Sequence, residues 1–219
     1  RHRLVVVTGP GGVGKTQLAL TAAAESDSDH PDGSWFIELA AFTDRTAVVE
    51  GICTQLGITA VAGRTPEQRL LEYLAPQRVL LVLDNCEHLL DACARLADGL
   101  LRACPQVRVL ATSREALGLA GEQHYLIEPL QLASQSADPV EIGRAESVQL
   151  FVVRARAAAP AFELHAGNAR VVADLCARLD GLPLAIELAA ARAKLFSPRA
   201  MLTRLDRRLD LSNAAGRDR

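Results

Sequence analysis

A glycine-rich segment near the start of the chain constrains the fold most strongly. Residues 9–16 read Gly-Pro-Gly-Gly-Val-Gly-Lys-Thr, which matches the pattern GxxxxGK[ST] at every fixed position. The apolar run Leu4–Thr8 predicts a buried strand before it, and Lys15–Glu25 predicts a helix after it. A chance lysine in a glycine-rich turn is the alternative, but this strand–loop–helix context favours a loop that wraps around phosphate groups.

The residue types of the loop suit that chemistry. Glycines let successive backbone N–H groups point inward, and the N-terminus of the following helix adds partial positive charge. Lys15 is expected to reach the β- and γ-phosphates of a nucleotide, and the Thr16 hydroxyl is expected to bind Mg²⁺. The candidate phosphate-binding residues are Gly11, Gly12, Val13, Gly14, Lys15, Thr16 and Gln17.

A second candidate lies at the end of a strand predicted over residues 79–83, which is apolar at every position and is followed by Asp84. A carboxylate at that place suits Mg²⁺, so we expect Asp84 to share the metal with Thr16. Glu87 has two interpretations of equal weight. It could complete a helix capping box with Asp84, or it could polarise an attacking water molecule as a catalytic residue.

Arg114 is a third candidate, just past a strand predicted over residues 107–112. An arginine there could contact the γ-phosphate of a nucleoside triphosphate. The alternative is an exposed arginine on a surface loop.

The order of the predicted elements indicates an α/β domain followed by a helical one. Strands at Leu4–Thr8, 34–39, 79–83, 107–112 and 123–127 alternate with helices at Lys15–Glu25, Arg45–Gln55, Pro66–Leu74 and 89–101, as in a parallel sheet. We therefore predict a nucleotide-binding domain over residues 1–131 and a linker over 132–143. A helical bundle should occupy 144–219, with helices at Glu146–Ala158, at 169–179 behind an Asn168 cap, at 184–196 with Pro183 in the first turn, and from Ser197 onward.

Composition excludes several classes of protein. The 219 residues are 49% hydrophobic and 23% charged, so disorder is not expected, and the net charge of −2 argues against direct nucleic-acid binding. No apolar run approaches the length of a membrane span. The five cysteines form no CxxC pair, which argues against zinc and disulfides and favours a cytoplasmic protein. The first residue is Arg1 and not Met, and a strand-like run begins almost at once, so we interpret the chain as part of a longer protein.

Four segments in this order resemble one family: GPGGVGKT, LLVLDNCEHL, VLATSRE and GLPLAIELAA. The chain is similar to the nucleotide-binding module of STAND regulators, the NB-ARC-like P-loop ATPases, and in particular to the modules of actinobacterial SARP-type and large LuxR-type transcriptional regulators. The resemblance covers essentially the whole chain.

The resemblance implies a five-stranded parallel sheet of order 5-1-4-3-2 followed by a small helical domain. It implies that ATP or ADP and Mg²⁺ bind at the loop, with Thr16 and Asp84 on the metal and Arg114 on the γ-phosphate. It further implies that the backbone at Arg3 and Leu4 touches the base edge and that Pro183 packs on adenine. Asn85 stands where many members of the family carry a second acid, so we expect hydrolysis to be slow or to depend on Glu87.

Together these features predict a nucleotide-dependent switch that works with itself or with other domains of a full-length regulator. A phosphotransferase acting on a small molecule is the main alternative, although residues 40–78 contain no arginine-rich lid. A motor-type ATPase and a scaffold that binds no nucleotide are further alternatives. The intact Lys15, Thr16 and Asp84 argue against the scaffold.

Overall fold

The structure is a computed structural model that describes residues 2–215, with side chains described from residue 2 to residue 207. Arg1 and residues 216–219, which the predicted domains include, lie outside the described residues. The chain divides into two compact units, Arg1–Ile127 and Glu128–Arg219. The domain bounds 1–131, 132–143 and 144–219 stay a prediction.

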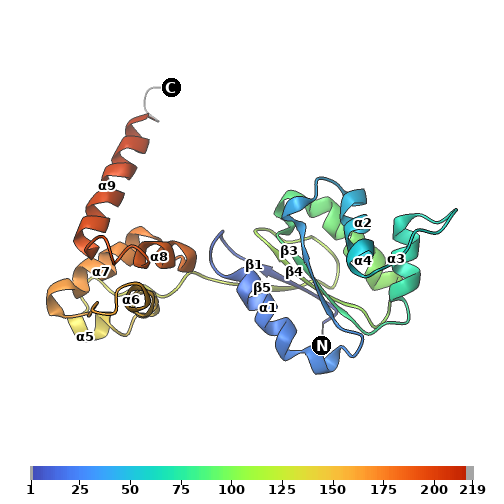
Figure 1. Cartoon of the computed structure of the whole chain (residues 1–219), viewed down its shortest axis with the longest axis horizontal. Helices are drawn as coiled ribbons and strands as arrows, with labels where there is room; N and C mark the ends of the chain where they lie inside the picture. The colour runs from blue at the N-terminus through green and yellow to red at the C-terminus, as the bar shows by residue number, and fades with distance from the viewer. Residues whose placement is uncertain (1, 216–219) are drawn as a thin grey trace. The chain divides into compact units, whose positions relative to one another are not determined.

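The first unit contains a sheet of five parallel strands (Figure 1). The strands are β1 (Leu4–Thr8), β2 (Ser34–Glu38), β3 (Leu80–Asp84), β4 (Arg108–Ser113) and β5 (Gln123–Leu126). Their spatial order is β2-β3-β4-β1-β5. The same order read from the other edge is 5-1-4-3-2, so the predicted fold class and strand order are confirmed. Two strands are displaced by one residue from the prediction, and Asp84 is consequently the last residue of β3.

Helices cover both faces of this sheet, as is usual for parallel strands (Figure 1). One face packs against α2 (Arg45–Gln55), α3 (Pro66–Leu74) and α4 (Leu90–Ala103) in the largest core cluster, and the other packs against α1 (Lys15–Glu25) in a smaller one. Alternate residues of β1 serve the two faces: Leu4 and Val6 belong to the large cluster, and Val7 belongs to the small one. Short 3₁₀ turns at η1 (Asp27–Asp29), η2 (Leu39–Ala41) and η3 (Cys86–His88) complete the unit.

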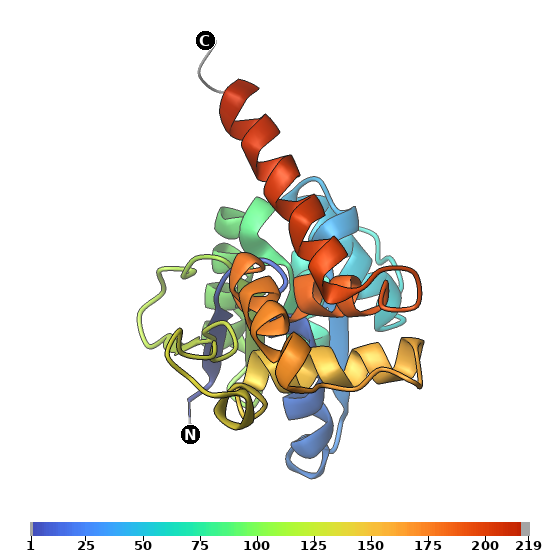
Figure 2. The same ribbon diagram turned by 90° about the vertical axis from the view of Figure 1, so that its left-hand side faces the viewer.

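The described residues of the second unit form helices and connecting loops, without a strand (Figure 2). Its helices are α5 (Pro139–Ile142), α6 (Glu146–Ala158), α7 (Ala166–Arg178), α8 (Pro183–Ala190) and α9 (Pro198–Ala215). They enclose a core that includes the fully buried Phe151, Ile142 and Ile186. The segment predicted as a linker thus contains α5, which begins with a capping box at Asp138 and a proline at its first position.

Two helix ends of this unit differ from the prediction. Asn168 is not the N-cap of α7, because the helix begins three residues earlier and His165 is the cap. The His165 ring nitrogen Nδ1 accepts a hydrogen bond from the Gly167 N–H (3.2 Å), and the Asn168 side chain accepts one from the His165 N–H (2.9 Å). Pro183 opens α8 as predicted, but this helix ends at Ala190 and not at residue 196.

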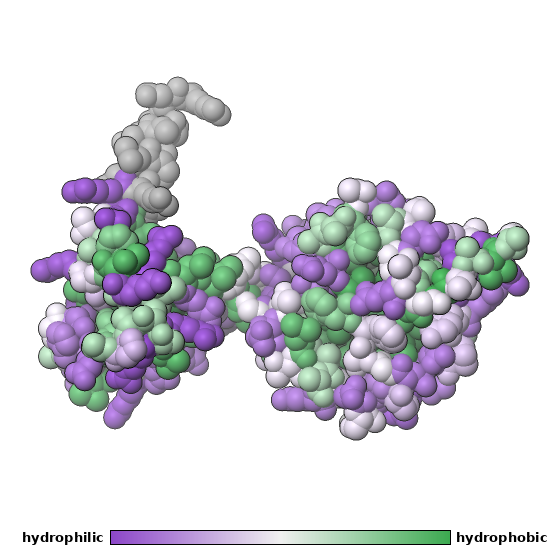
Figure 3. All heavy atoms as spheres, in the orientation of Figure 1, coloured by the Kyte–Doolittle hydropathy of each residue, from purple (hydrophilic) through white to green (hydrophobic). Residues whose placement is uncertain are grey.

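Apolar side chains reach the surface of both units among charged ones (Figure 3). In the second unit, Leu184 and Leu188 of α8 are more than half exposed. An apolar pocket of about 520 Å³ lies between α8 and α9, and Arg192, Arg204 and Arg207 are among its lining residues. No helix among the described residues is long and apolar enough to cross a membrane.

On each side of the boundary between the units, the chain makes a backbone hydrogen bond within its own unit. The Ile127 N–H donates a hydrogen bond to the Thr8 carbonyl (2.8 Å), which extends the pairing of β5 with β1. Three residues later, the Leu130 N–H donates to the Gly181 carbonyl (3.0 Å) in the second unit. Only Glu128 and Pro129 lie between these two attachment points.

Candidate functional site

The glycine-rich loop joins the carboxyl end of β1 to the start of α1. Gly14, the residue before the helix, has a φ of 105°, which a residue with a side chain rarely adopts. Gly9 lies so close to the end of the sheet that a Cβ there would be 2.6 Å from the Ile127 carbonyl oxygen. These two positions accept only glycine without strain, so the loop sequence is required by its backbone path.

Lys15 lies inside this loop and is only 9% exposed. Its ammonium group donates hydrogen bonds to the carbonyl oxygens of Gly9 (2.8 Å) and Pro10 (3.0 Å). An ammonium has three donors, so one donor is left for a further acceptor after these two bonds. The lysine thus holds the loop in its curled form and keeps a positive charge at its centre.

The charges around Lys15 come from the residues that the sequence singled out. Burial lowers the pKa of the Lys15 ammonium, Glu87 raises it, Arg114 lowers it and Asp84 raises it. The structure therefore brings the loop lysine, the β3 carboxylate, Glu87 and Arg114 to the same edge of the sheet.

Asp84 and Thr16 are in direct contact, as predicted for a shared metal site. The Thr16 hydroxyl donates a hydrogen bond to Asp84 Oδ1 (2.8 Å). A hydroxyl and a carboxylate are hard oxygen donors that suit Mg²⁺. Among the described residues there is no group of three or more His, Cys, Asp or Glu side chains that could hold a metal. This donor pair fits a Mg²⁺ ion that takes its other ligands from water and phosphate oxygens, as is usual for this ion.

Thr112 also belongs to this site, although the sequence analysis did not single it out. Its buried hydroxyl donates to Asp84 Oδ1 (2.6 Å) and accepts from the Asn85 N–H (2.9 Å). It therefore fixes the end of β3 from the neighbouring strand β4. A polar residue near the end of a predicted strand was the available signal.

Glu87 and Arg114 form an ion pair, with Arg114 Nε 3.2 Å from Glu87 Oε1. The capping-box interpretation of Glu87 is wrong, because Asp84 is the last residue of a strand and its carboxylate bonds hydroxyls. The 3₁₀ turn that follows has Asn85 at its N-terminal flank and no side-chain cap. The guanidinium of Arg114 is near the loop, since a Cβ on Gly11 would be 3.5 Å from its nitrogen NH2.

Other predicted residues are not brought to this edge. Arg3 and Leu4 lie at the opposite end of β1 from the loop. Leu4 is buried in the main core. The Arg3 guanidinium donates to carbonyls at the end of α4 and just after it, those of Leu101 (2.8 Å), Cys104 (2.5 Å) and Val107 (3.3 Å). Pro183 belongs to the second unit. A role for these residues in base binding stays a prediction.

Comparison with known proteins identifies the family to which the chain belongs. A family model described as an AAA domain matches residues 1–122, which is more than half of the chain. The chain belongs to this family of P-loop ATPases. Two proteins of Mycobacterium tuberculosis are similar to it over nearly all of its length. One is uncharacterized (44% identity, 98% of this chain and 52% of the relative), and the other is named as a candidate HTH-type transcriptional regulator (42%, 94% and 22%).

A more distant relative and a solved structure are also similar to the chain. The regulatory protein AfsR of Streptomyces griseus is 30% identical over 85% of this chain and 18% of its own length. A STAND protein with a tetratricopeptide repeat sensor from Pyrococcus horikoshii has the same fold, with a TM-score of 0.57 and 16% identity over 93% of this chain and 30% of that one. The predicted resemblance to STAND modules of bacterial regulators is confirmed. The chain spans about half the length of the uncharacterized relative and about a fifth of the two regulators.

Proposed function

We propose that this AAA domain and its helical unit form a nucleotide switch of a bacterial transcriptional regulator. In this proposal ATP or ADP binds at the glycine-rich loop. Its phosphates are surrounded by the start of α1 and by the residues Gly11, Gly12, Val13, Gly14, Lys15, Thr16 and Gln17. The single observation that carries the proposal is the hydroxyl–carboxylate pair of Thr16 and Asp84 beside the buried Lys15 ammonium. These groups are the phosphate clamp and the metal ligands that a P-loop requires.

Mg²⁺, when bound, supplies positive charge that compensates the phosphate oxygens. Thr16 and Asp84 would hold it, and Thr112 fixes the Asp84 carboxylate through its short hydrogen bond. Hydrolysis is proposed to be slow, because Asn85 supplies no second carboxylate and the Glu87 carboxylate is engaged by Arg114. Arg114 is proposed to contact the γ-phosphate, so that the triphosphate and diphosphate forms differ in their contacts and favour different conformations.

The partners proposed are the adenine nucleotide and either a second copy or other domains of the full-length regulator. We propose a cytoplasmic location, without direct contact of this chain with nucleic acid or membrane. The exposed leucines of α8 and the apolar pocket beside them support a surface for protein contacts, since soluble monomers rarely expose extended apolar patches.

The test of this function is nucleotide binding by a lysine variant, measured by isothermal titration calorimetry with Mg-ADP and with a non-hydrolysable Mg-ATP analogue. We expect Lys15→Ala to raise the dissociation constants of both nucleotides by a factor of 100 or more. Removal of a charged hydrogen-bonding group costs on the order of 3 kcal/mol of binding free energy.

The matched control is Lys194→Ala, because Lys194 is the only other lysine, is exposed and lies in the second unit. It should bind both nucleotides with the wild-type affinity. Unchanged affinity in Lys15→Ala would refute the proposed site, and a wild-type chain that binds neither nucleotide would refute the function.

A further inference from the structure

We propose that Glu87 sets how strongly the site distinguishes a nucleoside triphosphate from a diphosphate, by holding the Arg114 guanidinium against its carboxylate. This inference rests on the proposed nucleotide site. It assigns to Glu87 the role of a competing anion, in addition to any contact that it makes with water.

The ion pair joins two neighbouring strand ends beside the loop. Glu87 lies in the 3₁₀ turn after β3, and Arg114 is the first residue after β4. Their contact of 3.2 Å places the guanidinium between Glu87 and the glycine-rich loop, within 3.5 Å of the Cβ position of Gly11. Gly11 has no side chain, so Arg114 can approach the loop backbone on this side.

The two side chains of the pair differ in their exposure to solvent. The Arg114 side chain is 65% exposed, whereas that of Glu87 is 21% exposed. The second carboxylate oxygen of Glu87, Oε2, is buried and accepts no hydrogen bond from any residue that the structure describes. Arg114 therefore donates the one hydrogen bond that the described residues give to the Glu87 carboxylate, and Lys15 adds positive charge nearby. Separation of the pair leaves the carboxylate without a hydrogen-bond donor among these residues.

A phosphate group competes with Glu87 for this guanidinium. The planar fork of arginine binds carboxylate and phosphate oxygens with the same donors, so it cannot satisfy both fully. A nucleotide that draws Arg114 to its γ-phosphate must first separate the pair. Since a diphosphate has no γ-phosphate, it avoids this cost. The Glu87 carboxylate thus weakens triphosphate binding relative to diphosphate binding.

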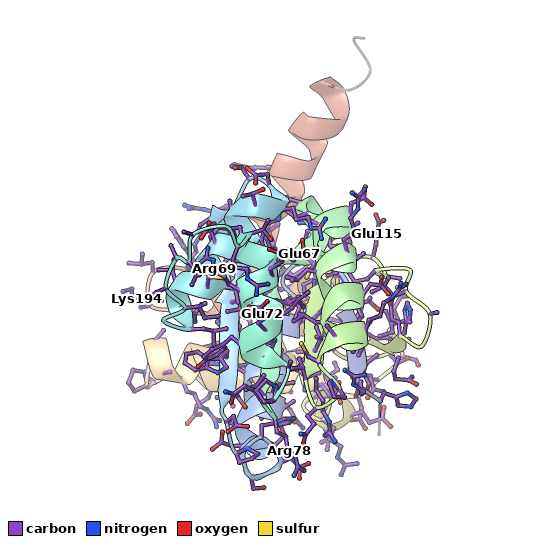
Figure 4. The ribbon with its side chains drawn as sticks, turned by 90° about the vertical axis from the view of Figure 1, so that its right-hand side faces the viewer. Glu67, Arg69, Glu72, Arg78, Glu115 and Lys194 are labelled. Carbon is purple, nitrogen blue, oxygen red and sulfur yellow. The ribbon has the colours of Figure 1, made fainter. Side chains whose placement is uncertain are left out.

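The experiment compares the dissociation constants of Mg-ADP and a non-hydrolysable Mg-ATP analogue for wild type and Glu87→Gln, by calorimetry. The amide keeps the shape of the side chain but loses its charge. We expect the ratio of triphosphate to diphosphate affinity to rise about three- to fivefold, the size expected for a partly exposed ion pair. Glu115→Gln is the matched control. Glu115 follows Arg114, is exposed (Figure 4) and loses the same charge, so its ratio should not change.

A double-mutant cycle assigns the effect to the pair. In the Arg114→Ala background, Glu87→Gln should leave the affinity ratio unchanged, because no guanidinium is left to release. The inference is overturned by an unchanged ratio in Glu87→Gln, by an equal change for both nucleotides, or by a change that persists without Arg114. If Glu87→Gln fails to fold, as judged by its thermal unfolding, Glu87→Asp provides the second variant. The shorter side chain keeps the charge but draws it away from the guanidinium, so the ratio should rise by a smaller factor, and an unchanged ratio would overturn the inference.

The Lys15→Ala variant separates the two proposals. If wild type binds both nucleotides, Lys15→Ala binds neither, and Glu87→Gln leaves the ratio unchanged, the role of Glu87 is wrong and the nucleotide site stands. If wild type binds neither nucleotide, both proposals are wrong.

Discussion

Asn85 has a left-handed backbone, with φ 67° and ψ 51°, directly after the strand that carries Asp84. Asparagine is one of the few residues with a side chain that adopts this conformation readily. Its N–H donates to the Thr112 hydroxyl, and its side-chain nitrogen lies 3.5 Å from the His88 ring. The presence of asparagine at position 85, in place of a second acidic residue, therefore has a structural reason. Asn85 satisfies the backbone conformation of the turn that joins β3 to η3.

A substitution of Thr112 tests these contacts at the level of single residues. Thr112→Val removes the hydroxyl that bonds both Asp84 and the Asn85 N–H while it preserves the shape of the side chain. We expect the free energy of unfolding to fall by about 1–3 kcal/mol, because a buried N–H is left without its acceptor. Urea denaturation followed by circular dichroism measures the loss. Magnesium-dependent nucleotide binding should weaken as well, since Asp84 is then fixed by Thr16 alone.

Thr112→Ser is the control, because it keeps the hydroxyl and loses only a methyl group. It should retain most of the stability and the wild-type dependence of binding on Mg²⁺. Equal stability of Thr112→Val and wild type would show that the hydrogen bonds of this hydroxyl contribute nothing to the end of β3.

At the scale of elements, the start of α7 offers a direct test of the capping residue. His165→Ala removes the ring nitrogen that accepts from the Gly167 N–H. We expect a loss of about 1 kcal/mol in the free energy of unfolding, the usual effect of removing an N-cap. The measurement is denaturant unfolding of the whole chain, followed by a helix signal.

His165→Ser is the matched variant, because serine is a preferred cap and should preserve stability. A chain with His165→Ala that is as stable as wild type would contradict the observed cap. Asn168→Ala should also be destabilised, because the Asn168 side chain accepts from the His165 N–H.

Much of the fold could be predicted from the sequence because its signals are local. The β1 strand and the helices α1, α2, α3 and α6 have the predicted bounds, since the signals for each element lie within the segment or beside it. The start of α7 could not be predicted, because histidine is an unusual cap and Asn168 is a usual one. The short helix α5 was missed, since four residues are too few for a periodic pattern.

Some residues of the candidate site could likewise be predicted from local motifs, and others could not. Lys15, Thr16 and Asp84 could be found because each follows a recognisable motif. Thr112 could not, because its contact with Asp84 joins strands that are neighbours in space and far apart in sequence. The Glu87–Arg114 pair depends on the same long-range contact. Outside the site, Arg69 of α3 (Figure 4) is another residue whose contacts could not be predicted from a motif. Its buried guanidinium bonds the Thr59 carbonyl (3.0 Å) and lies 3.4 Å from the Glu50 carboxylate.

For the whole molecule, the proposed switch predicts a response of the helical unit to nucleotide. Ligand at about 100 times its dissociation constant should stabilise the chain by about 2.7 kcal/mol. If Pro183 packs on the adenine as the resemblance implies, backbone amides at the start of α8 should become protected from hydrogen exchange when Mg-ADP is added. Mass spectrometry of peptides that cover residues 179–190 measures this protection.

Peptides from the loop at residues 9–16 serve as the positive control, and those from α5 serve as the reference for general stabilisation. Protection at the loop without any at α8 beyond that reference would contradict the role of Pro183 while it supports the phosphate site. The same experiment on Lys15→Ala should show protection at neither place.

The contact between Gly9 and Ile127 has a mechanical consequence. The first residue of the loop touches Ile127, the residue that leaves the sheet, and three residues further on the Leu130 N–H donates to the Gly181 carbonyl. A movement of the loop backbone must therefore displace the start of this short tether or collide with it.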